Sequence, residues 1–345
     1  MRKCMFSEEG QWYKGNLHSH TTNSDGRLKP EEAVKLYKNH GYHFLCFSEH
    51  DFFTDLREKF DCEDFILLPG VEASAYLVDP EKKGVIKTHH IHGILGNEWM
   101  QKQAGEKVFA HGEKLQPPVY VGTWDGLMAA QKLSDWLREK GCFTTYNHPI
   151  WSRVELQEVE KLTGIWAMEI YNYGTQIECG EGYDTVFWEQ MLRKGTKIMG
   201  FASDDNHNPG KFFDSLGGYV MVKSKELSHE SIVNHLLAGD YYFSGGPHIE
   251  QWGIEDGKIF VECSGVERIN FIAGGMLAGS ETILSHNGLL NNGLHELRGD
   301  ETYVRVECID RYGRTAWTNP LWFKKGVDLL YEISMLEYPI GRSAS

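Results

Sequence analysis

Histidines and carboxylates of the kind that bind metal ions recur between residues 18 and 207. His18 and His20 are two residues apart, so on an extended strand both rings leave the same face. Most of the others come at or just past the end of a short apolar run. The candidate ligands are His18, His20, Asp25, His50, Glu72, His90, His148, Asp205 and His207. Imidazole combined with carboxylate suits zinc, manganese or iron, whereas calcium and magnesium sites seldom use imidazole.

Each of these residues, taken alone, has a simpler explanation. A His-x-His pair is common by chance, and Asp25-Gly26 fits a turn. Glu72 fits a surface salt bridge, and Asn147-His148-Pro149 fits the end of a loop. The prediction rests on their occurrence together, because successive predicted strands each have a His, Asp or Glu at or near one end. One metal site is therefore expected.

Short apolar runs alternate with helix-like segments over the first 240 or so residues. The expected strands are Leu17–Thr21, Tyr42–Phe47, Phe65–Leu68, Ile91–Leu95, Cys142–Tyr146, Ile165–Tyr171 and Lys197–Ala202. Helices are expected after Pro30, over Leu127–Arg138 and over Val186–Arg193. The alternation predicts a parallel sheet with crossover helices, and roughly seven such units suggest a closed barrel. In a parallel barrel the carboxyl ends of the strands converge on one mouth, where catalytic sites form.

The pattern changes at Ser244-Gly245-Gly246-Pro247, which is typical of a linker. Beyond it the chain has short β segments, among them Tyr303–Cys308, in which polar and apolar residues alternate with period two. We therefore predict an α/β domain that carries the metal site over residues 1–243 and a small β-sandwich over residues 247–345.

Composition restricts the class of protein. A net charge of −14 argues against a non-specific nucleic-acid binder, but a cluster of divalent cations could still attract a small anionic substrate. Residues 1–11 lack the apolar core of a signal peptide, and no membrane span is expected. Seven cysteines without a CxxC pair favour reduced thiols, so a cytoplasmic location is expected. The oligomeric state is not predicted.

The order of the motifs resembles that of the PHP (polymerase and histidinol phosphatase) superfamily over roughly residues 12 to 240. The motifs are Asn16-Leu17-His18-Ser19-His20-Thr21, Ser24-Asp25-Gly26, Glu49-His50-Asp51, Gly70-Val71-Glu72, Asn147-His148-Pro149 and Asp205-Asn206-His207. The tail is similar to the β-module that follows some bacterial PHP domains, several of them in the carbaryl-hydrolase-like branch. The resemblance implies a distorted seven-stranded β/α (TIM-like) barrel.

The resemblance also implies a trinuclear site, with two or three divalent manganese, zinc or iron ions bound. The first ion would take His18, His20, Glu72 and Asp205; the second would share Glu72 and add His90 and His148; the third would take Asp25, His50 and His207. His89 and His92 compete with His90 for its role. Asp204, beside Asp205, is either a ligand or an outer residue.

The expected function is hydrolysis of a phosphomonoester, or of a small phosphodiester, by a metal-bound hydroxide without a protein nucleophile. Three divalent ions and three carboxylates leave a local charge of about +3, which suits a phosphate. Arg153 and Glu169 are candidate substrate contacts or outer residues of the site, and a strand-end salt bridge explains each of them equally well. Two alternatives stand beside this: a carbamate, ester or amide hydrolase that uses the same metals, and a non-catalytic binding protein.

Overall fold

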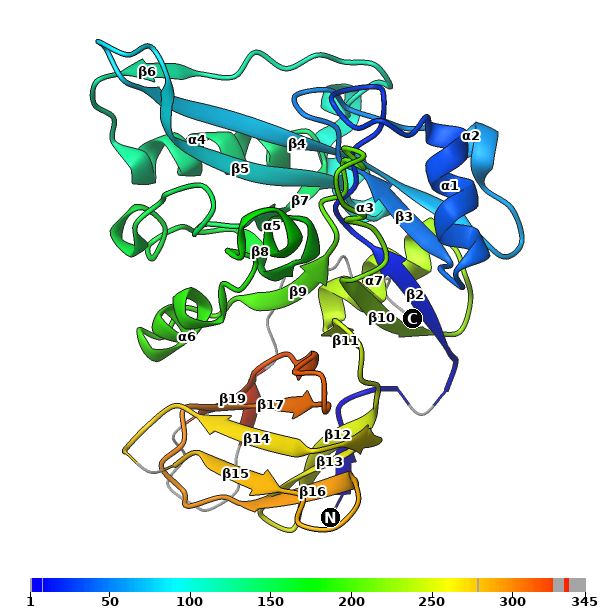
Figure 1. Ribbon diagram of the computed structural model, residues 1–345, viewed down its shortest axis with the longest axis vertical. Coiled ribbons are helices and arrows are strands. Elements are labelled where there is room, and N and C mark those ends of the chain that lie inside the picture. The colour runs from blue at the N-terminus through cyan, green and yellow to red at the C-terminus, as the bar shows by residue number, and fades with distance from the viewer. Residues whose placement is uncertain (1, 8, 278, 325–331, 335–345) are drawn as a thin grey trace.

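The computed structural model describes residues 2–7, 9–277, 279–324 and 332–334. Figure 1 shows an elongated molecule with a larger α/β part above and a smaller β part below. Among the described residues, no helix is long and apolar enough to cross a membrane.

The upper part is built on one mixed sheet. Its strands, in order of pairing, are β11 (Tyr241–Ser244), β10 (Tyr219–Ser224), β2 (Gln11–Asn16), β3 (Phe44–Phe47), β4 (Ile66–Val78), β5 (Val85–Leu95), β7 (Cys142–Tyr146), β8 (Ile165–Asn172) and β9 (Met199–Ser203), with β6 (Val119–Val121) against β4. The pairs β2–β3, β3–β4, β7–β8 and β8–β9 are parallel, but β5 is antiparallel to both β4 and β7. The sheet is therefore not the parallel one expected, because β4 connects directly to β5 as a hairpin instead of crossing over through a helix.

Two expected positions along these strands are corrected by the structure. β2 ends at Asn16, so His18 and His20 lie just past the strand and not on it. The Asn16 side chain ends the strand, since its amide donates to the His18 carbonyl at 2.8 Å and its oxygen accepts the His18 N–H at 3.3 Å. Glu72 and His90, expected at strand ends, lie inside the long strands β4 and β5.

Helices cover the outside of this sheet. They are α1 (Pro30–Asn39), α2 (Arg57–Phe60), α3 (Glu98–Ala104), α4 (Gly126–Glu139), α5 (Tyr173–Cys179), α6 (Thr185–Arg193) and α7 (His229–Ala238), with short 3₁₀ turns at Gly105–Lys107 and Leu156–Glu158. α1 begins at Pro30, as expected from a proline at the first helical position. The Asp125 side chain caps α4 by accepting the Met128 N–H at 3.0 Å. α4 then packs its buried face on β4, β5 and β7.

The ends of the sheet approach each other beside the candidate ligands. Among the described strands the ladder does not run round into a closed barrel. Just past β2 and β9, however, the Asp205 N–H donates to the His18 carbonyl at 3.0 Å, and the His20 N–H donates to the Asn206 carbonyl at 3.1 Å. These two bonds bring residues about 190 positions apart in the chain together at one end of the sheet.

The lower part consists of two facing sheets. One contains β1 (Arg2–Cys4), β12 (Ile249–Glu255), β13 (Lys258–Val266) and β16 (Leu290–Glu296); the other contains β15 (Glu281–Leu284), β14 (Arg268–Ala273), β17 (Tyr303–Ile309), β18 (Thr315–Thr318), β19 (Leu321–Lys324) and β20 (Glu332–Ser334). One apolar core, which includes Trp252, Val261, Phe271 and Val306, lies between them. β1 pairs with β12, so residues 2–4 lie in this part although they begin the chain. Residues 335–345 of the predicted second domain lie outside the described residues.

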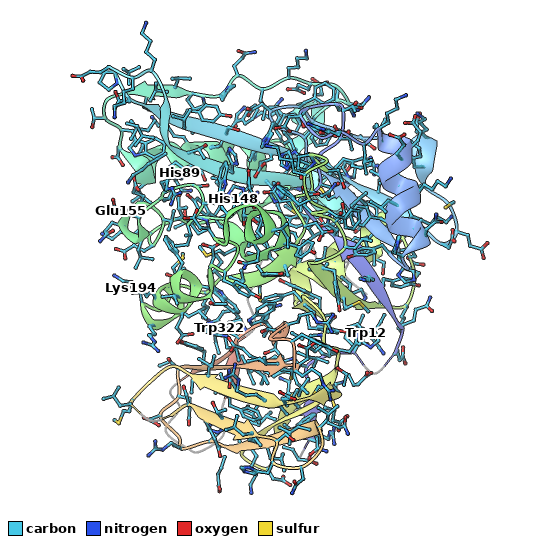
Figure 2. The ribbon with its side chains drawn as sticks, in the orientation of Figure 1. Trp12, His89, His148, Glu155, Lys194 and Trp322 are labelled. Carbon is cyan, nitrogen blue, oxygen red and sulfur yellow. The ribbon has the colours of Figure 1, made fainter. Side chains whose placement is uncertain are left out.

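The two parts are joined by strands and aromatic rings. β11 pairs with β18, so the upper sheet continues into the lower part. Phe243 of β11 stacks on Trp317 of β18 with ring centroids 5.6 Å apart. Trp12 and Trp322 lie at the level where the parts meet (Figure 2).

Candidate metal centre

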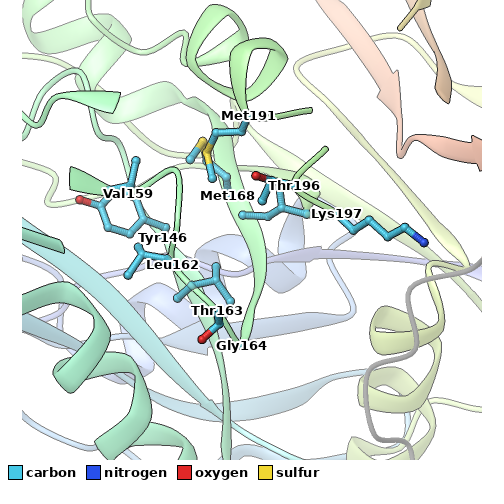
Figure 3. A pocket seen from close by; sticks show the side chains of 11 residues that line it. Tyr146, Val159, Leu162, Thr163, Gly164, Met168, Met191, Thr196 and Lys197 are labelled. Carbon is cyan, nitrogen blue, oxygen red and sulfur yellow. The ribbon is translucent and has the colours of Figure 1, made fainter. Parts of the chain in front are cut away.

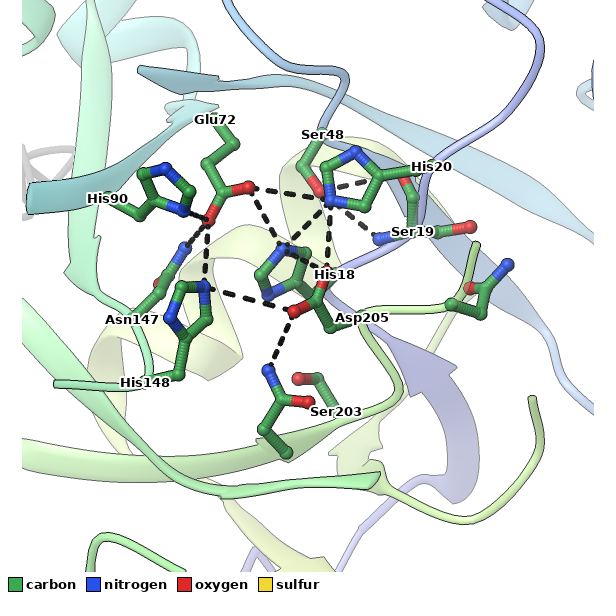
Figure 4. A network of polar contacts seen from close by, with 12 residues as sticks. His18, Ser19, His20, Ser48, Glu72, His90, Asn147, His148, Ser203 and Asp205 are labelled. Atoms are coloured by element: carbon green, nitrogen blue, oxygen red, sulfur yellow. Dashed lines mark hydrogen bonds and ion pairs between the residues drawn. The ribbon is translucent and has the colours of Figure 1, made fainter. Parts of the chain in front are cut away.

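The nine candidate ligands meet at the end of the upper sheet where β2 and β9 approach each other. Loops after β2, β3, β7 and β9 carry seven of them, and the β4–β5 hairpin carries Glu72 and His90. Figure 4 shows His18, His20, Glu72, His90, His148 and Asp205 turned toward one another. The structure therefore brings together residues that the sequence separates by up to 189 positions (from His18 to His207).

The innermost group joins His18, His20, Glu72 and Asp205. Asp205 Oδ1 lies 3.0 Å from Nε2 of His18 and 3.0 Å from Nε2 of His20. The two Nε2 atoms are only 3.1 Å apart, and Glu72 Oε2 is 3.3 Å from His18 Nε2 and 3.4 Å from His20 Nε2. Protons can satisfy only some of these contacts, whereas one cation would satisfy all four donor atoms together.

Glu72 is the centre of the wider cluster. Six imidazoles have a nitrogen between 3.1 and 3.7 Å from its carboxylate: His18, His20, His50, His90, His92 and His148. Asn147 adds an amide N–H donated to Glu72 Oε1 at 2.9 Å. A carboxylate has about four lone-pair sites, so this many neighbours exceeds what hydrogen bonds alone can use.

An outer group, closer to solvent, joins Asp25, His50, His207 and His20. His207 Nε2 is 3.3 Å from Asp25 Oδ1, and His50 Nε2 is 3.7 Å from Asp25 Oδ2. His50 belongs to two groups, since its Nδ1 is 3.1 Å from Glu72 Oε2. The Asp25 side chain is 58% exposed, so this group opens toward the entrance of the site.

The electrostatics of the cluster suit divalent cations. Buried atoms without a hydrogen-bond partner among the described residues include Glu72 Oε2, Asp205 Oδ1 and His90 Nδ1. Burial would raise the pKa of Glu72, but His18 and the hydrogen bond to His148 hold that pKa well below its usual range. Burial lowers the pKa of His90 to about 4, so its ring is neutral. Ionised carboxylates and a neutral imidazole all offer lone pairs to a cation, so the donor set fits transition-metal ions.

Carboxylates of the cluster also raise the pKa of two other imidazole rings, those of His148 and His207. Burial opposes protonation of His148, but its contact with Glu72 raises its pKa to about 9. Asp25 does the same for His207, whose pKa is also raised to about 9 despite burial. The carboxylates thus create a strong local demand for positive charge, which a metal ion would meet.

Glu169 lies behind His18 and not in the substrate cavity. Its Oε1 is 2.9 Å from His18 Nδ1, and its Oε2 accepts the His148 N–H at 3.1 Å and the Asn172 amide at 3.0 Å. The carboxylate is fully buried, which fits an outer residue that orients His18 better than a substrate contact. Asn172, which the sequence reading missed, also donates to Asp205 Oδ2 at 2.9 Å. Asn172 is the last residue of β8, so a search for polar side chains at strand ends, which indicated the candidate ligands, would also have indicated Asn172.

The positions of His89, His92 and Asp204 distinguish these alternative candidates from the nine candidate ligands. His89 points to the other face of β5, where its Nδ1 is 2.6 Å from the Tyr146 hydroxyl. His92 shares the face of His90, but it belongs to none of the donor groups found among the described residues. Asp204 points away from the cluster and accepts the N–H groups of residues 216–218 at 2.7 to 2.8 Å. None of these three belongs to a donor group among the described residues, whereas His90 does.

A cavity of about 500 Å³ opens above the cluster. It is lined by Asp25, Arg27, His50, His90, His148, Trp151, Gly174, Thr175, Glu178, Asp205, His207, Pro209, Lys211, Phe212 and Asp214. Arg153, the other proposed substrate contact, is absent from this lining and pairs with Glu181 at 2.9 Å. The sequence reading missed Arg27, Trp151 and the loop 207–214, because nothing in their local pattern marks them as cavity walls.

A second, smaller cavity lies at the opposite ends of β8 and β9 (Figure 3). Its volume is about 180 Å³, and it is lined by Tyr146, Val159, Leu162, Thr163, Gly164, Ile165, Met168, Met191, Thr196, Lys197 and Ile198. This lining holds no histidine, cysteine or carboxylate, so this cavity offers no metal-binding donor set.

The fold and the site define a mixed α/β protein with a carboxylate–histidine cluster. No protein-family model and no curated protein matches the sequence. A two-domain protein from Bacteroides vulgatus that contains a predicted PHP-like metal-dependent phosphoesterase is similar over 90% of this chain and 94% of its own, at 13% identity and a TM-score of 0.42.

Two shorter solved structures are also similar. An amidohydrolase from Chromobacterium violaceum with bound sulfate covers 58% of this chain and 89% of its own, at 16% identity and a TM-score of 0.36. A proposed metal-dependent phosphoesterase from Bifidobacterium adolescentis covers 59% of this chain and 91% of its own, at 16% identity and a TM-score of 0.35. Similarity to PHP-like proteins, expected from the motifs, is thus found among solved structures. The sequence identities and TM-scores are too low to transfer an activity to this chain.

Proposed function

We propose that this protein is a metal-dependent phosphomonoesterase of the PHP superfamily. The observation that carries the proposal is the set of imidazoles around Glu72, each with a nitrogen within 3.7 Å of its carboxylate. The ordered motifs from His18 to His207 support the family assignment. The hydrogen bonds that join residues 18–20 to residues 205–206 support a distorted barrel closed at the metal end.

We assign the nine candidate ligands to two or three divalent ions. His18, His20, Glu72 and Asp205 would hold the first, with Glu72 shared by a second near His90 and His148, and with Asp25, His50 and His207 outermost. When bound, such ions supply Lewis acidity and lower the pKa of water to about 7. This chain's own residues position that chemistry: Glu169 orients His18, while Asn147 and Asn172 hold the carboxylates of Glu72 and Asp205.

Charge favours a phosphoryl group over a neutral carbonyl. Glu72, Asp205 and Asp25 contribute about three negative charges against the six positive charges of three divalent ions. The net charge of about +3 would attract a phosphate dianion. The cavity wall formed by Trp151 lies against two candidate ligands, with ring centroids 5.9 Å from His90 and 5.1 Å from His148. That wall would exclude water from one side of the reacting group.

Metal analysis and a substrate panel test the proposal. The full chain is stripped with a chelator, reloaded with manganese, zinc or iron, and analysed for metal content. It is then assayed with 4-nitrophenyl phosphate, bis(4-nitrophenyl) phosphate, 4-nitrophenyl acetate and 1-naphthyl methylcarbamate. We expect two or three ions per chain and metal-dependent release of phosphate from the monoester. Less than one ion per chain after reloading would contradict the metal centre, and turnover of the acetate or carbamate alone would favour the rival hydrolase.

A further inference from the structure

Two cations stand at the mouth of the cavity above the cluster. Arg27 and Lys211 both line this cavity, and both are exposed. Neither forms an ion pair with any described carboxylate, although the chain has 49 acidic and 35 basic residues. An unpaired cation pair beside a cavity in an acidic protein is a candidate anion-binding feature.

The two cations converge from separate segments. The Arg27 N–H donates to the His207 carbonyl at 2.9 Å, which ties this arginine to the loop 207–214. Its guanidinium Nη1 would lie only 3.1 Å from a Cβ added at Gly210, so the group rests directly on that loop. Lys211 is the next residue along the loop.

Two of the carboxylates that line the cavity, Asp25 and Asp214, have other partners. Asp25 faces His207 at 3.3 Å and His50 at 3.7 Å. Asp214 accepts the N–H groups of His207 at 2.8 Å and Asn208 at 3.0 Å. Glu178 of α5 also lines the cavity, but among the described residues no ion pair joins it to Arg27 or Lys211. The positive charge of Arg27 and Lys211 is therefore available to a ligand.

We infer that Arg27 and Lys211 bind a second anionic group, carried by the leaving-group portion of the substrate. This inference rests on the proposed function, in which the phosphoryl group lies at the metal ligands. A guanidinium fork matches a carboxylate or a phosphate through two parallel hydrogen bonds, and a lysine adds a point charge. Trp151 and Phe212 line the same cavity and offer apolar walls to the stem between the two anions. The substrate class is thus a phosphomonoester of a small alcohol or phenol that carries a carboxylate or a further phosphate.

Matched substrate pairs test this specificity. 3-Phosphoglycerate is compared with glycerol 3-phosphate, and 4-carboxyphenyl phosphate with phenyl phosphate, using the manganese-loaded full chain. We expect kcat/KM to be about tenfold or more higher for the carboxylated member of at least one pair. In the double variant Arg27→Ala/Lys211→Ala this ratio should fall to about one. Arg153→Ala removes an exposed cation outside the cavity and should keep the wild-type ratio.

A binding measurement separates this inference from the proposed function. Calorimetry compares 3-phosphonopropionate with propylphosphonate, which are not hydrolysed. We expect the carboxylated ligand to bind about tenfold tighter to the wild type, and the difference to vanish in the double variant. If no phosphomonoester is turned over but this difference persists, the inference holds and the proposed function fails. If the ligands bind alike in the wild type, or if the double variant keeps the preference, the inference is overturned even where phosphate is released.

Discussion

The candidate ligands occupy backbone and side-chain states that cost folding free energy. His148 has a φ of 25° and Asp205 a φ of 50°, a left-handed region that residues other than glycine seldom adopt. Such positions cost on the order of 1–3 kcal/mol each and tend to persist at functional sites. Both residues also point into a buried cluster that is rich in carboxylates. Bound cations would offset part of this cost by pairing the donors that the fold leaves unpaired.

Replacing Glu72 with Gln tests the centre of the cluster. Glu72→Gln keeps the size of the side chain but removes its charge and one good donor oxygen. We expect metal content to fall at two positions together and turnover to drop by several orders of magnitude, since misplacement by about 1 Å costs ~100-fold. Metal content and phosphomonoester hydrolysis are measured on one preparation.

The matched control for this variant is His111→Ala. His111 is exposed and its ring accepts the Asp55 N–H at 3.1 Å, away from the cluster. Its metal content and turnover should stay within a few-fold of the parent. A Glu72→Gln protein that stays fully metallated and active would contradict the bridging role of Glu72.

Glu169 offers a test of orientation that keeps all nine candidate ligands. Glu169→Gln weakens the charge-assisted hydrogen bond to His18 Nδ1, now 2.9 Å long, which directs Nε2 into the cluster. We expect metal affinity, measured by competition with a chelator, to fall about 10–100-fold. The melting temperature of the metal-free protein should change little in comparison. Unchanged affinity would show that His18 needs no such partner.

At the scale of elements, α4 fixes the position of the β4–β5 hairpin that carries two candidate ligands. Leu137 of α4 is fully buried, and a Cβ added at Gly93 of β5 would lie 2.8 Å from its Cδ2 atom. The absence of a side chain at Gly93 therefore lets the helix approach β5 closely. Packing on this helix thus bears on where His90 lies, even though α4 itself carries no ligand among the described residues.

Leu137→Ala should destabilise the fold by about 2–5 kcal/mol, because it removes buried methyl groups and leaves a cavity. The free energy of unfolding is measured by urea titration. Met128→Ala on the same helix is the control, since Met128 is 48% exposed and its loss should change stability by about 0.5 kcal/mol or less. Equal effects of the two substitutions would mean that α4 does not pack as described.

At the scale of the whole molecule, a buried ion pair ties the upper part to the lower one. Arg305 of β17 contacts Glu189 of α6 at 3.0 Å, and the two side chains are 3% and 13% exposed. The guanidinium also lies 4.8 Å from the ring centroid of Trp188, and the Tyr303 hydroxyl donates to Glu189 at 2.7 Å. Together with the β11–β18 pairing, this contact makes the β part a structural support of the α/β part.

Arg305→Ala should destabilise the protein by about 3 kcal/mol, because it removes a buried guanidinium from both Glu189 and Glu307 and leaves Glu189 only Arg193 and the Tyr303 hydroxyl. Arg193→Ala is a matched control: Arg193 pairs with the same Glu189 at 3.0 Å, but its side chain is 66% exposed. Its loss should cost about 0–1 kcal/mol. Chemical denaturation measures both, and similar losses for the two variants would rule out a special role for the buried pair.

The sequence alone predicted several of the elements and the donor types of the candidate site, since both depend on local chemistry. β7 was predicted over Cys142–Tyr146 and is found there, and α4 agrees within one residue at each end. Periodic burial and helix capping act over a few residues, so a single segment reveals them. The nine candidate ligands were recognisable for the same reason, because donor type and motif order are visible in the chain.

Tertiary structure decided which residues face one another. Glu72 and His90 meet across an antiparallel hairpin that the predicted parallel sheet did not include. The sequence left open whether Asp204, beside Asp205, is a ligand, but the N–H groups of residues 216–218 hold it away from the cluster. Glu169 lies behind His18, 151 residues away in the chain. Such placements depend on pairings between distant segments, whose energies no local pattern contains, and for that reason only the folded chain could determine them.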